Sequence, residues 1–340
     1  MKEILVRLTA GEALTDQEIK QAMEHLFSDD ITDSEISAFL IGLKTKGETV
    51  EEIAGLVNGI RAKALKFKKR FPDVMDNCGT GGDGVKSFNV SSTSAFVIAA
   101  SGIPVAKHGN RSVSSKTGSA DVLEELGIEL NLSSGRIEEI IEEVGIAFLF
   151  APNVHPKIKR IQKVRKDLGI PTVFNLLGPL MNPVDLDTQF LGVYRRDLAK
   201  MFAEVLHALG RKRAVVLNGA GSMDEASLQG DNYLVILENG IITEKTLHPD
   251  EVGLPTYPNE AIVGGYAREN AEILRNVLKG KKGAYRDTVL LNAGIGIYVG
   301  GKAKSIQHGV EMAEELIDSG AAFEKLNRLI EASKVKSEVI

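Results

Sequence analysis

Apolar side chains recur at the intervals of an α-helix through the first 72 residues. One helix face would hold Ile36, Phe39, Leu40 and Leu43. Such spacing predicts helices that each bury one face, because side chains three and four positions apart lie above one another. We therefore expect residues 1–72 to form a small N-terminal α-helical domain.

Start signals for three of these helices stand in the sequence. A threonine followed three residues later by a glutamate is typical of a helix N-terminus, since each side chain accepts a hydrogen bond from the other residue's backbone amide. The pairs are Thr15 with Glu18, Thr32 with Glu35, and Thr49 with Glu52. They predict three successive helices within this domain.

The pattern changes near residue 73, where short apolar runs begin to alternate with helical stretches. This alternation predicts a large α/β domain over 73–340, with a central, mostly parallel sheet flanked by helices. Beyond about residue 259 the spacing is again helical, most clearly over 304–319 and 321–333. The predicted strands are 73–78, 103–107, 146–150, 188–194, 213–219 and 233–240.

Residues 155–182 interrupt this alternation. They begin with a helical stretch, HPKIKRIQKVRKDLG, and continue with an irregular stretch broken by Pro and Gly. We expect this segment to return to the N-terminal helices and complete their domain.

Charge and cysteine content narrow the classes of partner. The net charge is −5, so no overall positive field attracts nucleic acid or an anionic membrane. A single cysteine, Cys78, excludes internal disulfides and multi-cysteine metal sites. The first residues lack the apolar core of a signal peptide, and no apolar run approaches a membrane span. We expect a cytoplasmic protein that binds neither nucleic acid nor membrane.

A glycine-rich segment, GTGGDG at 79–84, follows the first predicted strand and precedes a helix that begins near Ser91 or Ser92. Glycines allow the backbone to turn several amides toward an anion, and the helix N-terminus adds partial positive charge. No acidic residue follows at dinucleotide-binding spacing, and Val85 replaces the lysine of a Walker A loop. The loop therefore indicates a phosphate site, with a purely structural turn as the alternative.

Two further segments carry candidate chemistry. The sequence KHGNR at 107–111 comes directly after a predicted strand, and its cations suit a sugar phosphate or pyrophosphate. Asp224 and Glu225 follow another strand and suit Mg²⁺, which prefers hard oxygen ligands. The alternatives are a solvated basic loop and an ordinary exposed acidic pair.

In their shared order, these motifs resemble the anthranilate phosphoribosyltransferase family over essentially the whole chain. Individual pieces also occur in pyrimidine nucleoside phosphorylases, but the combination of KHGNR, VRKDLG and NLLGPLMNP is specific to the anthranilate branch. The motifs are GTGGDG at 79–84, FNVSS at 88–92, KHGNR at 107–111, SSKTGSADVLEELG at 114–127, VRKDLG at 164–169, NLLGPLMNP at 175–183 and MDEAS at 223–227.

The resemblance implies transfer of a phosphoribosyl group from 5-phosphoribosyl-1-pyrophosphate (PRPP) to anthranilate in tryptophan biosynthesis, by a Mg²⁺-dependent homodimer. It places anthranilate at Gly79, Asn110 and Arg165, and the metal at Ser91, Asp224 and Glu225. The PRPP residues that it implies are Gly79, Gly82, Asp83, Ser87, Asn89, Val90, Ser91, Ser92, Lys107, His108, Gly109, Asn110, Arg111, Ser112, Val113, Ser114, Ser115 and Ser119.

Two other functions remain as alternatives. A pyrimidine nucleoside phosphorylase would use phosphate and a nucleoside, and the presence of Arg165 and NLLGPLMNP argues against it. A nucleic-acid-binding relative without catalysis should be basic and lack parts of KHGNR or the acidic pair, whereas this chain is acidic and has both.

Overall fold

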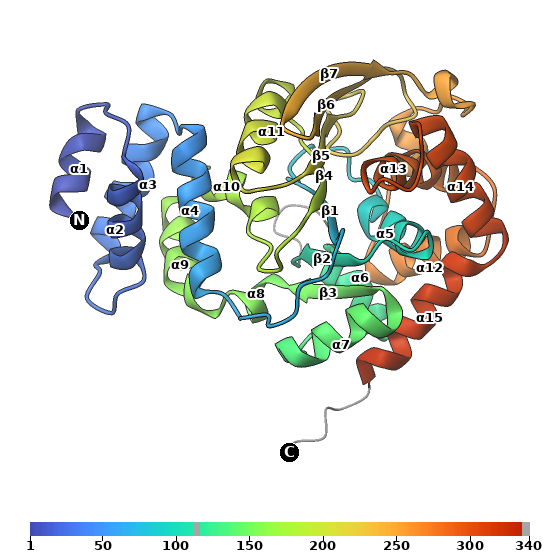
Figure 1. Ribbon diagram of the computed structural model, residues 1–340, viewed down its shortest axis with the longest axis horizontal. Coiled ribbons are helices and arrows are strands. Elements are labelled where there is room, and N and C mark those ends of the chain that lie inside the picture. Colours follow the sequence, from blue (N-terminus) through green and yellow to red (C-terminus); the bar gives the residue numbers. More distant parts are fainter. Residues whose placement is uncertain (112–115, 335–340) are drawn as a thin grey trace.

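A computed structural model describes residues 1–111 and 116–334. It confirms a small N-terminal helical part and a large α/β part with a mostly parallel sheet flanked by helices. Figure 1 shows helices α1–α4 gathered on one side of the molecule, away from the sheet. Within the described ranges, no helix is both long and apolar enough to cross a membrane.

The N-terminal part consists of α1 (Lys2–Thr9), α2 (Asp16–Leu26), α3 (Asp33–Lys46) and α4 (Val50–Lys63). All three predicted capping boxes form, at the starts of α2, α3 and α4. Their buried faces meet in one apolar core that contains Ile36, Phe39, Leu40 and Leu43. The helical period in the sequence therefore marks the buried side chains correctly.

An extended connection leads from α4 to the sheet. It is fastened to α7 (Ser134–Val144), because the carboxylate of Glu138 accepts hydrogen bonds from the backbone amides of Lys68 and Lys69. The amide of Leu65 donates to the carbonyl of Val154 at 2.8 Å. The connection is thus held at several backbone positions.

Residues beyond the third strand come back to the N-terminal helices. The segment contains α8 (Ala151–Val154), α9 (Lys159–Leu168) and α10 (Phe174–Leu177). Ile161 and Val164 of α9 belong to the same apolar core as Phe39 and Leu40 of α3. Figure 1 shows α9 beside α3 and α4, although more than ninety residues separate α9 from α4.

Seven strands form one sheet in the order β3-β2-β1-β4-β5-β6-β7. Neighbours from β3 to β5 run parallel, and β6 and β7 are antiparallel. The sequence did not predict β7, a mostly exposed edge strand with two charged residues, Glu244 and Lys245. The strands are β1 (Met75–Gly79), β2 (Val105–Gly109), β3 (Ile146–Phe150), β4 (Thr188–Gly192), β5 (Arg213–Asn218), β6 (Asn232–Glu238) and β7 (Ile241–Leu247).

Each face of the sheet is covered. Along β5, Val215 and Leu217 enter one core, while Ala214 and Val216 enter the core shared with the N-terminal helices. This alternation is the period of two expected of a strand between two layers. The remaining helices are α5 (Val90–Ala100), α6 (Ser119–Glu125), α11 (Ala199–Ala208), α12 (Ala267–Leu278), α13 (Ala284–Val299), α14 (Ile306–Asp318) and α15 (Ala321–Lys334).

Strand β1 marks the point where the chain order of the sheet reverses. Its neighbours are β2 on one side and β4 on the other, and all three run parallel. In open α/β sheets a crevice forms beyond the carboxyl ends of the strands at such a point. The glycine-rich segment leaves β1 there, so the topology places it where ligands bind.

Candidate active site

Asp224 lies between the carboxyl ends of β1 and β4, where two glycines make room for it. A Cβ at Gly79 would collide with the Asp224 carboxylate, and a Cβ at Gly192 would collide with the Asp224 backbone. The amide of Gly81 donates to Asp224 Oδ2 at 2.6 Å. The glycine loop and the acidic pair are therefore in direct contact.

Three carboxylates gather at this position. One oxygen each of Asp83, Asp224 and Glu225 lies within 4.8 Å of the others. Asp83 Oδ1 accepts from the amide of Val85 at 3.1 Å, whereas its buried Oδ2 has no hydrogen-bond partner among the described residues. Ser87 Oγ donates to Glu225 Oε2 at 3.1 Å. Such a set of hard, negatively charged oxygens fits a divalent cation.

Burial and mutual repulsion raise the pKa values of this cluster. The pKa of Asp224 rises to about 7, first because burial disfavours its charged form and then because Asp83 is nearby. Burial also raises the pKa of Glu225 well above its ordinary range, and the charges of Asp224 and Asp83 add to this. Without a cation, the cluster therefore holds protons near neutral pH.

The glycine loop depends on left-handed backbone at three positions. Gly81, Gly82 and Gly84 have φ values of 68°, 85° and 76°. Residues other than glycine rarely adopt this region of backbone conformation. Gly82 is exposed at the surface of the loop. The loop thus presents bare backbone beside the carboxylates, as a phosphate-binding loop requires.

The start of α5 lies next to this loop. Asn89 is its N-cap residue, and Asn89 Oδ1 accepts from Asn270 Nδ2 at 2.9 Å. Val90 is buried as the first helical residue, and the backbone oxygen of Ser91 accepts from Asn77 Nδ2 at 2.7 Å. The buried Ser92 hydroxyl has no hydrogen-bond partner in the described part of the chain.

Lys107 reaches the site from β2. Its buried ammonium group donates to the backbone oxygen of Asn77, and burial lowers its pKa although Asp76 and Glu225 oppose the shift. Asp76 lies beneath the site, where burial raises its pKa to about 6. Its carboxylate accepts from Asn182 Nδ2 at 2.9 Å and from the amide of His108 at 3.2 Å. This buried group fixes the ends of β1 and β2 together.

His108 is a buried neutral side chain. Burial lowers its pKa to about 3 and that of His155 to about 4, and the two rings meet edge to face at 5.2 Å. The cationic, doubly protonated form of either ring is therefore unfavourable at neutral pH.

The second loop is described only in part, since Ser112, Val113, Ser114 and Ser115 lie outside the described residues. Gly109 ends β2, and the exposed Asn110 accepts at its backbone oxygen from the hydroxyl of Ser119 at 3.2 Å. The guanidinium of Arg111 is turned to α6 instead, where its ion pairs to Asp121 and Glu124 raise its pKa.

Arg165 lies on α9, half-buried, and contacts the segment that follows. Its Nη2 donates to Asn175 Oδ1 at 3.5 Å, and its guanidinium lies 5.3 Å from the centre of the Phe174 ring. Burial lowers its pKa. Its hydrogen bond within the described ranges goes to Asn175 and not to the carboxylate cluster.

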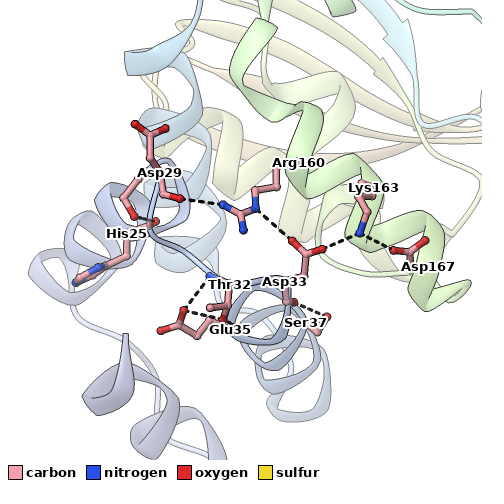
Figure 2. A network of polar contacts seen from close by, with 10 residues as sticks. His25, Asp29, Thr32, Asp33, Glu35, Ser37, Arg160, Lys163 and Asp167 are labelled. Atoms are coloured by element: carbon pink, nitrogen blue, oxygen red, sulfur yellow. Dashed lines mark hydrogen bonds and ion pairs between the residues drawn. The ribbon is translucent and has the colours of Figure 1, made fainter.

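Salt bridges hold α9 in place on α3. Asp33, the first residue of α3, binds Arg160 Nε at 3.2 Å and Lys163 Nζ at 2.7 Å. Lys163 also pairs with Asp167 at 3.2 Å. Figure 2 shows these side chains along the face where the two helices meet. The helix that carries Arg165 is therefore tied to the N-terminal helices by charge as well as by apolar packing.

Sequence reasoning missed several polar groups at the site. It treated Asp83 only as a PRPP contact, whereas the structure groups it with Asp224 and Glu225. Thr80 and Asn77 also carry buried oxygens without a hydrogen-bond partner among the described residues. Asp83 lies inside the glycine motif, so its charge was the available signal.

Comparison with known proteins identifies the family. A family model described as "Glycosyl transferase family, helical bundle domain" matches residues 2–64, and one described as "Glycosyl transferase family, a/b domain" matches residues 71–323. An anthranilate phosphoribosyltransferase of Bacillus mycoides (strain KBAB4) is 54% identical over 338 residues, which cover 99% of either chain. The chain belongs to the anthranilate phosphoribosyltransferase family. An enzyme of the same name from Exiguobacterium sibiricum is 58% identical over 329 residues, 97% of either chain.

Solved structures of the anthranilate phosphoribosyltransferase family have the same fold. That of Thermus thermophilus superimposes with a TM-score of 0.92 at 40% identity, over 98% of this chain and 99% of its own. The Saccharomyces cerevisiae enzyme in complex with PRPP and Mg has a TM-score of 0.88 at 27% identity, over 97% of either chain.

These relationships confirm the resemblance seen in the sequence motifs. The chain is a pentosyltransferase of tryptophan biosynthesis that transfers the phosphoribosyl group of PRPP to the amine of anthranilate, with pyrophosphate as the second product. The comparisons support this reaction over a pyrimidine nucleoside phosphorylase and over a non-catalytic relative.

Proposed function

We propose that PRPP binds across the glycine loop and the start of α5, with its pyrophosphate beside Asp83, Asp224 and Glu225. The observation that carries this is the direct contact between the loop and the carboxylates, from the Gly81 amide to Asp224 and from Ser87 to Glu225. The full set of proposed PRPP-binding residues is the one predicted from the sequence: Gly79, Gly82, Asp83, Ser87, Asn89, Val90, Ser91, Ser92, Lys107, His108, Gly109, Asn110, Arg111, Ser112, Val113, Ser114, Ser115 and Ser119.

Mg²⁺ fits the carboxylate cluster. The buried Asp83 Oδ2 has no hydrogen-bond partner among the described residues. The pKa values of Asp224 and Glu225 are raised first by burial and then by the negative charges of the neighbouring carboxylates. Asp224, Glu225 and Ser91 would hold the metal, with Asp83 as an additional ligand. A Mg²⁺ ion held there would supply positive charge that stabilises the pyrophosphate leaving group.

The protein's own groups complete the transfer. Loop amides directed at the pyrophosphate stabilise the charge that develops as the C1–O bond breaks. The aromatic amine of anthranilate is neutral at pH 7, so the reaction needs no strong general base. Arg165, with Gly79 and Asn110, would bind anthranilate, and its guanidinium would orient the amine toward C1 through the carboxylate. The two substrates then meet between the sheet and α9.

The proposal also includes the domain boundaries and the oligomeric state of the protein. The helical domain comprises residues 1–72 completed by about 155–182, and the α/β domain comprises 73–340. The protein acts in the cytoplasm as a homodimer joined through the helical domain. Support comes from a hollow on α1 and α3 lined by Lys2, Leu5, Val6, Thr9 and Glu35, where Val6 is 60% exposed.

One assay tests the site and its metal together. Anthranilate fluorescence should fall when PRPP and Mg²⁺ are added, and a chelator should stop the fall. Asp83→Asn should raise the Mg²⁺ concentration needed for half-maximal rate, whereas Asp16→Asn, the same change at an exposed position of α2, should not. Phosphate-dependent cleavage of a nucleoside, with no loss of anthranilate fluorescence, would contradict the proposal.

A further inference from the structure

Tyr194 lies at the carboxyl end of β4, two residues after Gly192, and its ring borders the glycine loop. A Cβ built on Gly82 would lie 3.7 Å from Tyr194 Cε1 and 3.9 Å from Cδ1. The ring edge nearest to Gly82 is therefore close to the hydroxyl. The side chain is 40% exposed, which is high for a large aromatic ring.

The other five tyrosines are engaged by protein groups. Tyr257 donates to Asp287, and Tyr285 donates to the backbone oxygen of Val263. Tyr233, Tyr266 and Tyr298 each have a cation over the ring. Across residues 1–111 and 116–334, Tyr194 has neither a hydrogen bond to its hydroxyl nor such a ring contact. Its ring lies beside the loop at Gly82.

The position of Tyr194 favours a role in ligand binding over a role in packing. It follows the strand next to β1 at the reversal point of the sheet, where the crevice for the ligand opens. A tyrosine has an apolar ring that can lie against bare glycine backbone and a polar end that seeks a partner. Its hydroxyl can donate a hydrogen bond to an anionic oxygen.

We propose that Tyr194 is a PRPP-binding residue. Its hydroxyl donates a hydrogen bond to the pyrophosphate of PRPP, and its ring lies against the loop at Gly82. This inference rests on the proposed PRPP site and adds a side chain that the family motifs do not include. Tyr194 would distinguish the pyrophosphate end of the donor from its ribose 5-phosphate end.

Tyr194→Phe tests the hydroxyl, because it keeps the ring and its contact with Gly82. We expect PRPP with Mg²⁺ to bind roughly tenfold more weakly, the effect of losing one hydrogen bond to a charged group. Inorganic pyrophosphate with Mg²⁺ should weaken similarly, while ribose 5-phosphate binding and the KM for anthranilate stay unchanged. Titration calorimetry measures the binding constants. Tyr233→Phe, the same change at a tyrosine on β6, serves as the control and should bind PRPP as the wild type does.

Each result has a defined meaning. If Tyr194→Phe binds PRPP and pyrophosphate as tightly as the wild type, the inference is wrong, even though the donor site stands. An equal loss for ribose 5-phosphate also overturns it, since Tyr194 would then act on the sugar end or on the loop fold. A wild-type protein that binds no PRPP would refute the donor site itself. Tyr194→Ala, checked for folding by circular dichroism, should weaken PRPP binding at least as much as Tyr194→Phe.

Discussion

At Gly79 and Gly192, the absence of a side chain decides where Asp224 can lie. Both glycines end parallel strands that are paired with each other, and a Cβ on either would displace Asp224 from the edge of the sheet. The carboxylate can then accept from the loop at Gly81. Single residues at strand ends thus join a phosphate-type loop to a metal-type cluster.

Replacing Arg165 should affect one substrate only. Arg165→Ala removes the charged partner proposed for the anthranilate carboxylate, so the KM for anthranilate should rise about 10- to 100-fold, as for loss of charge-assisted hydrogen bonds. The KM for PRPP should stay within about twofold of wild type on the same reasoning. Steady-state kinetics with each substrate varied measures both values. Lys166→Ala, at the exposed neighbouring position, is the control. An equal rise in both constants would contradict the assignment.

Binding of Mg²⁺ should depend on pH through Asp224. Its pKa of about 7 means that the metal-free cluster is partly protonated at neutral pH, and the metal must displace these protons. Affinity for Mg²⁺ should therefore fall as the pH drops below about 7, and binding should release protons. Calorimetry in two buffers of different ionisation enthalpy measures the release. Proton release that is absent at about pH 6.5, half a unit below that pKa, would contradict the prediction.

The same carboxylate should alter stability when no metal is present. Its pKa is raised from 3.8 to about 7 in the folded state, so the folded protein binds protons more tightly than the unfolded chain. Its stabilising effect is present at low pH and is lost as the pH rises through about 7. Asp224→Asn should flatten this dependence, measured as Tm between about pH 5 and 8 in a chelator, with Asp16→Asn as control. An unchanged slope in Asp224→Asn would show that Asp224 does not carry it.

At the scale of elements, the sequence predicted the features that depend on residues close together in the chain. The capping boxes of α2, α3 and α4 join residues three positions apart, so they could be read directly. Strand β7 was missed because it is mostly exposed and has no continuous apolar run. The pair Asn239–Gly240, with φ values of 52° and 82°, is a typical hairpin turn and was the available signal.

The composition of the site was harder to predict, because its contacts cross long sequence separations. Asp83 and Asp224 are more than a hundred residues apart, and the pairings of β1 with β4 and of β4 with β5 bring them together. Motif reasoning located the loop and the acidic pair but could not show that Arg111 turns to α6. Nor could it show that Lys107 is buried against Asn77. Such details depend on the three-dimensional neighbours of each side chain.

The charge contacts between α3 and α9 should influence anthranilate binding. Asp33→Asn loosens Arg160 and Lys163, and with them the helix that carries Arg165. Because these pairs are exposed, we expect only a roughly threefold rise in the KM for anthranilate, with kcat and the KM for PRPP unchanged. Kinetics at low salt measures this. Asp167→Asn, which leaves both contacts of Asp33 in place, should have a smaller effect. A larger effect in Asp167→Asn would overturn this explanation.

For the whole molecule, two exposed apolar residues at distant positions allow a test of the proposed dimer. Val6 on α1 is 60% exposed and Ile241 on β7 is 67% exposed. Val6→Glu places a charge in the hollow on the N-terminal helices and should shift the protein from dimer toward monomer. Ile241→Glu makes the same kind of change at the sheet edge and should leave the dimer intact. Sedimentation velocity measures the outcome. Dissociation by Ile241→Glu alone would place the interface elsewhere.

The return of α9 to α3 has a consequence for protein synthesis. The ribosome completes α4 at Lys63, but α9 and α10 appear only about a hundred residues later. At typical translation speeds this interval is on the order of 10 s. During that time the nascent helices must keep Phe39 and Leu40 without the cover that Ile161 and Val164 later provide. The N-terminal helices therefore gain this part of their apolar core only after α9 has been synthesised.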